Sequence, residues 1–348
     1  MKACIVTVYN SENCGSYWQS FALSSYLKLN GCEVSFLKRN VRGTSHSLLY
    51  VCSRTIKWLL KGKINRAHAQ IKQYLVFNKA IKAFRIVSNA EGFDLCVIGS
   101  DTLWNLEDQY FEANRSVFFG EKSGAKNTIT YAVSAANTPI LSFRSHPELK
   151  EDIIHMDAVS VRDRHTYSIV EQLTNIHAPI VVDPTLLLNK EEYQKYCIDF
   201  VSDNFLFVYY FGALPTELQK QIRLYANLNN LKIVVMGRGM EGDYNFDVFS
   251  PFVFVSCFSK ANYIVTNTFH GVMFTLIFEK QALFNSCGKE KIRDVLYEYK
   301  LQDRDYSCIA HNDCMDSNID YNYVRAKIEK NRLKTKAYIE KFIGGAEI

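Results

Sequence analysis

The stretch Ala3-Cys4-Ile5-Val6-Thr7-Val8 is an apolar run, and a polar loop separates it from residues 17–29, whose apolar positions recur at helical spacing. Gly31 stands where this helix would end, and the pattern of a strand resumes at Glu33–Leu37. A strand, a loop, a helix and a second strand in this order form the opening unit of a parallel α/β domain. The sequence therefore predicts that the chain begins with a doubly wound domain.

The alternation of strands and helices continues and then starts a second time. In the first series we predict a helix over about residues 54–84 and strands at residues 93–99, 127–134, 158–161 and 180–182. The second series has strands at residues 205–211, 233–236, 263–266 and 282–285 and helices at residues 216–228, 252–260 and 272–278. We therefore expect an α/β protein with two Rossmann-like domains, residues 1–188 and 204–320, and a terminal helix within residues 321–348 that packs back on the first domain.

Length and composition agree with this division. The chain has 348 residues, of which 48% are hydrophobic and 22% charged, and single hydrophobic cores stop growing near ~250–300 residues. No stretch approaches the ~20 apolar residues of a membrane span, and the first ten residues lack the pattern of a signal peptide. Ten scattered cysteines indicate reduced thiols. We expect a cytoplasmic protein.

The positive charge is concentrated in one segment. Twelve Lys and Arg and no Asp or Glu occur between Val34 and Ala90, although the net charge of the whole chain is only +5. No nucleic-acid-binding motif accompanies them, so we expect no nucleic-acid partner. Two interpretations of residues 39–85 stay open. The segment either docks on an anionic surface, which is the inner face of a membrane or the diphosphate of a lipid-linked acceptor, or forms a solvated helical face whose apolar residues pack on the first domain.

Five polar loops follow predicted strands: residues 13–19, 99–105, 134–137, 162–163 and 266–271. Because two such domains usually bind ligand between the carboxyl ends of their strands, we expect these loops to converge on one cleft. Gly15 and Ser16 stand at a helix start, where free N–H groups favour an anion. The alternative is a glycine turn with Ser16 as the helix cap.

Two side chains in these loops suit acid–base and anion chemistry. His270 follows a predicted strand and precedes a helix, which is a common position for an active-site residue. A bound dianion would favour protonation of its imidazole. Arg162 ends an apolar run and suits a bidentate grip on phosphate or carboxylate. The structural alternatives are a satisfied core histidine and an ordinary salt bridge.

Other chemistries have weaker support. Cys308, His311 and Cys314 could be three metal ligands, but no fourth residue is spaced to complete a structural zinc site, so we expect no metal. Asp183-Pro184 predicts a turn. No G-x-S-x-G elbow or phosphate-binding P-loop is present.

Together the motifs resemble those of the polysaccharide pyruvyl transferase family. The resemblance rests on ordered segments that span most of the chain: Asn13-Cys14-Gly15-Ser16-Tyr17-Trp18-Gln19, Val97-Ile98-Gly99-Ser100-Asp101-Thr102-Leu103-Trp104-Asn105, Ser160-Val161-Arg162-Asp163, Val182-Asp183-Pro184-Thr185-Leu186-Leu187 and Thr266-Asn267-Thr268-Phe269-His270-Gly271-Val272-Met273-Phe274. The resemblance implies the two-domain fold called GT-B.

The resemblance also implies a reaction. Family members transfer the pyruvyl group of phosphoenolpyruvate to sugar hydroxyls, giving a pyruvate ketal and phosphate, and no cofactor is required. His270 would then be the general acid and Arg162 the ligand of the donor anion. The acceptor would be a lipid-linked or nucleotide-linked saccharide of a capsule or exopolysaccharide. Candidate substrate-binding residues are Asn13, Gly15, Ser16, Gln19, Gly99, Ser100, Asp101, Trp104, Asn105, Ser134, Thr268 and Gly271.

One departure and two alternatives remain. Some family members carry an arginine where this chain has Thr268, and Arg238 or Lys289 could supply the missing charge. A nucleotide-sugar glycosyltransferase on the same fold, or a non-catalytic saccharide-binding member of an assembly system, would share these patterns.

Overall fold

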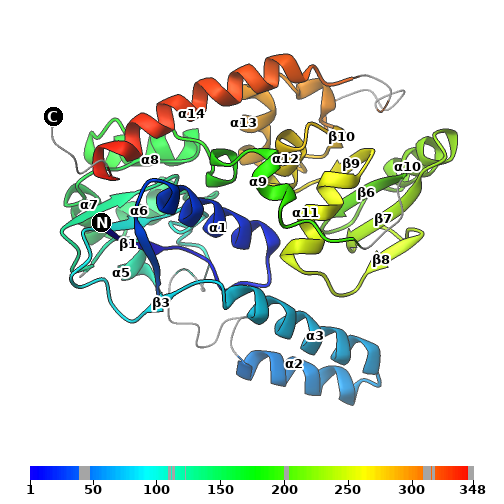
Figure 1. Ribbon diagram of the computed structural model, residues 1–348, viewed down its shortest axis with the longest axis horizontal. Coiled ribbons are helices and arrows are strands. Elements are labelled where there is room, and N and C mark those ends of the chain that lie inside the picture. Colours follow the sequence, from blue (N-terminus) through cyan, green and yellow to red (C-terminus); the bar gives the residue numbers. More distant parts are fainter. Residues whose placement is uncertain are drawn as a thin grey trace. The chain divides into compact units, whose positions relative to one another are not determined.

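The computed structural model describes residues 1–38, 48–108, 111, 114–121, 123–199, 204–308, 315 and 318–343 (Figure 1). Two compact units make up the chain. The first consists of Met1–Leu188 together with Glu329–Ile348, and the second is Asn189–Ile328. Each unit contains one five-stranded parallel sheet, which confirms the prediction of two doubly wound halves.

The sheet of the first unit has the strand order β3-β2-β1-β4-β5. Its strands are β1 (Lys2–Val6), β2 (Glu33–Leu37), β3 (Ile86–Val87), β4 (Leu95–Ile98) and β5 (Asn127–Thr130). Every residue of β4 is buried, as expected for a central parallel strand covered on both faces. The strands predicted at residues 158–161 and 180–182 are present only as isolated parallel bridges, Ile129 with Ala158 and Val161 with Ile180.

The first unit contains more helices than the two predicted, at residues 17–29 and about 54–84. Its helices are α1 (Cys14–Leu29), α2 (Leu48–Leu60), α3 (Ile64–Ile81), α5 (Arg115–Phe118), α6 (Ile140–Arg144), α7 (Pro147–Ile154), α8 (Arg164–Thr174) and the 3₁₀ helix η1 (Pro184–Leu187). The prediction of helix over about residues 54–84 is confirmed for most of that range, but Gly62 adopts φ +67° and divides the segment into α2 and α3. Residues 39–47 of the basic segment lie outside the described residues.

The sheet of the second unit has the order β10-β9-β6-β7-β8. Its strands are β6 (Phe205–Tyr210), β7 (Lys232–Gly237), β8 (Tyr244–Phe246), β9 (Tyr263–Thr266) and β10 (Gln281–Phe284). Its helices are α9 (Lys190–Gln194), α10 (Thr216–Leu228), α11 (Pro251–Lys260), α12 (Phe269–Ile277), α13 (Glu290–Glu298) and η2 (Gln302–Arg304). The sequence did not predict α9, α13, η2 or β8, and β8 is a short edge strand with no fully buried residue.

The last helix, α14 (Tyr321–Ile343), returns to the first unit with its final turns. Thr335 Oγ1 accepts a hydrogen bond of 3.1 Å from Val182 N–H, and the Tyr338 hydroxyl donates one of 2.7 Å to the Thr130 carbonyl. Tyr26 donates to the carboxylate of Glu340 at 3.1 Å. These polar contacts attach the end of α14 to the first unit. Thr335 follows its partner Val182 by 153 residues in the sequence.

Candidate functional site

Four of the predicted loops lie along the carboxyl edge of the first sheet. Isolated bridges join Asp101 to Val133, Val133 to Val161 and Val161 to Ile180, so parallel pairing continues past the ends of the strands. The Ser134 N–H donates to the Asp101 carbonyl at 3.1 Å, and the Arg162 N–H donates to the Val133 carbonyl at 2.9 Å. The loops that carry Asp101, Ser134 and Arg162 are therefore neighbours, as parallel pairing requires.

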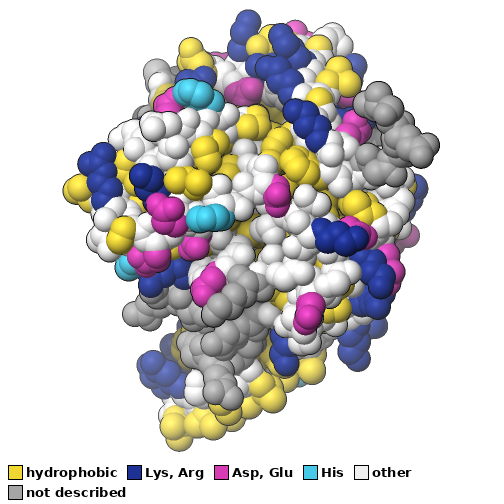
Figure 2. Space-filling view, turned by 90° about the vertical axis from the view of Figure 1, so that its left-hand side faces the viewer, with side chains coloured by type: hydrophobic (Ala, Val, Ile, Leu, Met, Phe, Trp, Pro, Cys, Tyr) yellow, Lys and Arg dark blue, Asp and Glu magenta, His cyan; other side chains and the backbone are white. Residues whose placement is uncertain are grey.

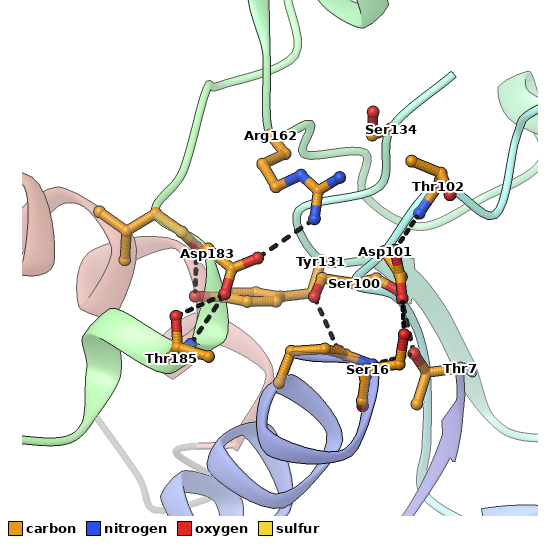
Figure 3. A network of polar contacts seen from close by, with 12 residues as sticks. Thr7, Ser16, Ser100, Asp101, Thr102, Tyr131, Ser134, Arg162, Asp183 and Thr185 are labelled. Atoms are coloured by element: carbon orange, nitrogen blue, oxygen red, sulfur yellow. Dashed lines mark hydrogen bonds and ion pairs between the residues drawn. The ribbon is translucent and has the colours of Figure 1, made fainter. Parts of the chain in front are cut away.

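Asp101 is the centre of the polar network at this edge (Figure 3). One carboxylate oxygen accepts a 2.8 Å hydrogen bond from the Ser16 hydroxyl, and the other accepts one of 2.8 Å from the Thr102 N–H. The residue has φ +89°, a conformation that aspartate tolerates better than most residues. The contact from Ser16 ties the start of α1 to the loop after β4.

Glycine is required at position 99, immediately before this network. Gly99 has φ +130°, and a Cβ atom there would lie 1.9 Å from the Tyr131 carbonyl oxygen. No flexible side chain could move aside, because the obstructing atom is backbone. The glycine therefore allows the loop after β4 to approach the neighbouring strand.

The proposed anion site at the start of α1 does not have the free donors expected of it. Asn13 is the N-cap of this helix, and its Oδ1 accepts hydrogen bonds from the N–H groups of Gly15 at 2.8 Å and Ser16 at 3.3 Å. The alternative that made Ser16 the cap is wrong for the same reason. An anion would have to displace the Asn13 side chain to reach these two donors.

Three other candidate binding residues, Gln19, Ser100 and Trp104, are fully buried. Gln19 is fully buried, donates to the Thr7 hydroxyl at 2.9 Å and accepts from the Ser100 hydroxyl at 2.8 Å. Trp104 is also fully buried, and its Nε1–H donates to the Phe118 carbonyl at 3.0 Å. These side chains support the loops from behind, so their prediction as substrate contacts is not compatible with this structure.

Asn105 and Ser134 lie at the same edge and hold the loops together. Asn105 Oδ1 accepts from the Thr138 hydroxyl at 3.1 Å, and the buried Ser134 Oγ accepts from the Ala136 N–H at 3.1 Å. Both side chains act as turn-forming groups in this arrangement. Asn105 is partly exposed to solvent, whereas Ser134 is buried.

Arg162 forms a buried ion pair. Its Nη1 lies 3.2 Å from Asp183 Oδ2, and the exposed fractions of the two side chains are 3% and 1% (Figure 3). Asp183 Oδ1 also accepts hydrogen bonds from the N–H and hydroxyl of Thr185, at 3.0 and 2.7 Å. The turn predicted at Asp183 is present, but the sequence analysis missed its pairing with Arg162. A donor anion would have to share the guanidinium with this carboxylate.

Glu12 is a titratable group at this edge that the sequence analysis did not single out. It precedes the N-cap Asn13, and burial raises the pKa of its carboxyl to about 7, with Arg54 acting in the opposite direction. A carboxyl with a pKa near neutrality can exchange protons at working pH. Nothing in the sequence pattern reveals this burial.

We expect Glu12 to make stability depend on pH. Its pKa rises from 4.5 to about 7 in the folded protein, so its contribution is most favourable below the unfolded pKa and is lost as the pH rises through the folded pKa. The free energy of unfolding of wild type should therefore fall relative to that of Glu12→Gln between pH 5 and pH 8. Urea denaturation at several pH values measures this, with Glu241→Gln, an exposed glutamate, as the matched control. Parallel pH profiles for wild type and Glu12→Gln would contradict the expectation.

The fifth loop lies at the carboxyl edge of the second sheet and carries His270. The helix there starts earlier than predicted, at Phe269, because the Thr268 side chain accepts a 2.9 Å hydrogen bond from the Gly271 N–H and acts as the N-cap. His270 is therefore in the first turn of α12 and not ahead of it, and it is partly exposed. Thr268 stabilises the helix start and leaves the imidazole near its positive end.

Gly271 has a packing role in this turn. A Cβ atom at this position would lie 2.1 Å from Thr266 Oγ1 and 2.5 Å from Thr268 Oγ1. The missing side chain lets the first turn of α12 lie against the two threonine hydroxyls. Gly271 was predicted to bind substrate. In the structure it allows this close packing, and its neighbour His270 lies in the same turn.

A second polar cluster surrounds the loop that precedes His270. Asn267 exchanges two hydrogen bonds with the Phe211 backbone, at 2.7 and 3.0 Å. Lys289 Nζ donates to the Asn267 carbonyl at 2.9 Å, whereas Arg238 is an exposed residue after β7. Of the two cations that could compensate for Thr268, Lys289 is the one that contacts this loop.

The possible metal ligands are only partly within the described chain. His311 and Cys314 lie outside the described residues, and Cys308 Sγ donates to Asp305 Oδ2 at 3.6 Å. Across the described positions there is no group of three or more His, Cys, Asp or Glu that could hold a metal ion.

Comparisons with solved structures identify the fold. A Listeria monocytogenes protein provisionally named a UDP-N-acetylglucosamine 2-epimerase aligns with a TM-score of 0.50 at 12% identity, over 99% of this chain and 91% of that one. A UDP-GlcNAc 2-epimerase from Neisseria meningitidis (TM-score 0.46, 9% identity, 100% and 95% covered) and a Streptomyces glycosyltransferase (0.46, 13%, 98% and 99%) also match. The fold, with its two parallel five-stranded sheets and C-terminal helix, is GT-B-like.

Comparisons of sequence identify the family. A search of curated proteins finds no match. The family model for polysaccharide pyruvyl transferases matches residues 13–284, a range that begins at the N-cap of α1 and ends with β10. It includes the loops of Asp101, Arg162 and His270. Since this match extends over most of the chain, the protein belongs to the polysaccharide pyruvyl transferase family.

Proposed function

We propose that this protein, a polysaccharide-modifying transferase, uses phosphoenolpyruvate as its donor. It moves the pyruvyl group onto a sugar of a lipid-linked or nucleotide-linked precursor of a cell-surface polysaccharide and forms a pyruvate ketal. The family match over residues 13–284 is the observation that carries this proposal. A likeness of fold alone would not separate this reaction from glycosyl transfer.

His270 is the general acid in this scheme. Its protonated imidazole gives a proton to C3 of the enol, which leaves positive character at C2. A sugar hydroxyl attacks C2 and loses its proton. A second hydroxyl then attacks C2, the bond between C2 and the phosphate oxygen breaks, and the proton of that hydroxyl leaves with the inorganic phosphate as the ketal closes. The position of His270 in the first turn of α12, after the carboxyl end of β9, supports the assignment, because ligands of open parallel sheets bind at the carboxyl ends of the strands.

Arg162 is the proposed ligand of the donor anion, and Asp183 orients its guanidinium at 3.2 Å. A planar guanidinium can pair with a carboxylate and still offer further N–H groups, since it has five donors in all. Lys289 is the proposed source of the positive charge that Thr268 does not supply. A charge-assisted contact of this kind contributes about 1.5–3 kcal/mol to binding.

The reaction can be tested with purified protein, phosphoenolpyruvate and a panel of lipid-linked and nucleotide-linked saccharides. We expect acceptor-dependent release of inorganic phosphate and a gain of one pyruvyl unit in the mass of one saccharide. The control reaction replaces phosphoenolpyruvate by nucleotide sugars. Release of a nucleoside diphosphate in that control, with no pyruvylated product in the first reaction, would identify a glycosyltransferase and overturn the proposal.

A further inference from the structure

The α2–α3 hairpin, residues 48–81, carries charge of one sign only. Seven cations occur in it, and neither helix nor the turn between them contains an Asp or Glu: Arg54, Lys57, Lys61, Lys63, Arg66, Lys72 and Lys79. All of them except Arg54 are exposed. Figure 1 shows the two helices side by side as an arm that extends from the sheet of its unit. Like charges at this density repel one another, and an anionic surface opposite them would offset that repulsion.

An apolar stripe runs along the exposed side of α2. Leu49 is 82% exposed and Leu60 is 84% exposed, and the other large members are also open to solvent: Leu48, Ile56 and Leu59. At 100° per residue these positions fall within about 120° of the helix circumference. Figure 2 shows hydrophobic side chains gathered along the lower edge of the molecule, which is where Figure 1 places α2. Five large apolar side chains on one face form a patch and not a scatter of single residues.

Packing against α3 does not account for this stripe. The buried residues of α2 are Val51 and Thr55, which lie on a different side of the helix from Leu49 and Leu60. The interpretation that the apolar residues of this segment form a core on the first domain is therefore wrong for Leu59 and Leu60. Trp58 is partly buried, and Arg54, Lys63 and Arg66 lie 5.9, 5.6 and 5.3 Å from its ring centre.

We propose that the α2–α3 hairpin binds the surface of an anionic lipid bilayer, with the apolar stripe of α2 among the acyl chains and the lysines at the phosphate groups. A helix with one apolar face and cations on its other sides is the form that lies in a bilayer interface. In the part of the chain that the structure describes, no helix has the length and hydropathy to span a bilayer, so the contact is peripheral. Charge favours this occupant over a second copy of the chain, because two hairpins with seven cations each would repel one another.

Vesicle sedimentation tests this inference without donor or acceptor, so its failure would leave the proposed reaction untouched. The full chain is mixed with vesicles of phosphatidylcholine alone or of phosphatidylcholine with phosphatidylglycerol. We expect binding to the anionic vesicles only, and weaker binding as added salt shortens the Debye length from ~10 Å at 0.1 M to ~3 Å at 1 M. Leu49→Glu with Leu60→Glu, and separately Lys57→Glu with Lys61→Glu and Lys63→Glu, should each lower the partition coefficient about tenfold or more.

Matched variants on other elements control for general changes in charge and hydropathy. Leu224→Glu with Leu228→Glu alters two exposed leucines of α10, and Lys150→Glu with Lys195→Glu and Lys232→Glu makes the same change of charge outside the hairpin. Both should bind as wild type does. Equal sedimentation with neutral and anionic vesicles, or none with either, would overturn the proposal. Light scattering gives a second way to overturn the proposal. If wild type were a dimer and Leu49→Glu with Leu60→Glu a monomer, the stripe would be a contact between two copies of the chain.

Discussion

Replacing His270 by alanine is expected to lower kcat by about 10²–10⁴-fold, because a positioned general acid typically contributes that much to a rate. The change should leave the fold intact. The first turn of α12 is held by the hydrogen bond between the Thr268 side chain and the Gly271 N–H, and the imidazole takes no part in it. Phosphate release from phosphoenolpyruvate in the presence of an acceptor measures the rate, and thermal unfolding checks the fold.

Two further variants make this result specific to His270. His270→Gln keeps a polar side chain but cannot donate a proton as an acid, so it should be as slow as the alanine variant. His155→Ala removes an exposed histidine whose Nδ1 lies 2.7 Å from the Glu151 carbonyl oxygen of its own helix turn, and this variant should keep full activity. A kcat within twofold of wild type for His270→Ala would exclude His270 as the acid.

Replacing Asp183 by asparagine is expected to lower the free energy of unfolding by about 3–5 kcal/mol, since it leaves the charge of Arg162 buried without its carboxylate. The side chains of the pair are 3% and 1% exposed, so bulk water solvates the guanidinium poorly once the carboxylate is neutralised. Asparagine keeps a carbonyl oxygen for the N–H and hydroxyl of Thr185, and the loss therefore reports mainly on the charge. Urea denaturation followed by circular dichroism measures it.

The matched control is a surface pair. Glu217→Gln removes the partner of Lys220 on α10, where both side chains are more than half exposed, and should change stability by less than about 1 kcal/mol. Arg162→Met combined with Asp183→Leu should be less destabilising than Asp183→Asn, because it removes both charges together. A loss for Asp183→Asn as small as that for Glu217→Gln would mean that the pair is dispensable for the fold.

The sequence predicted the two sheets well because buried parallel strands are nearly continuous apolar runs. Glu33–Leu37, Thr216–Leu228 and Tyr263–Thr266 are present with the predicted bounds. The errors have local causes. Gly62 broke one predicted helix by its positive φ, and Thr268 started α12 before the apolar pattern indicated it. Hydrophobic periodicity does not register a single turn or cap residue.

The candidate site residues at the carboxyl edges of the sheets were predicted less completely than the strands. Loops that follow strands were found correctly, because a parallel sheet brings their ends to one edge. The orientation of each side chain was not predictable. Trp104 and Gln19 lie in motif positions but point into the core, while Asp183 meets Arg162 from 21 residues further along the chain. The burial that shifts the pKa of Glu12 exists only in the folded chain and leaves no mark on the local sequence.

The discontinuity of the first unit has a consequence for how this protein is made. Its sheet is complete in sequence once β5 has been synthesised, but Thr335 and Tyr338, which bond to Val182 and Thr130, leave the ribosome only after the whole second unit. Domains generally fold as units during synthesis, the N-terminal one first. Here the second unit, Asn189–Ile328, can fold as one uninterrupted segment, while the nascent first unit waits for the C-terminal helix to receive its last hydrogen bonds.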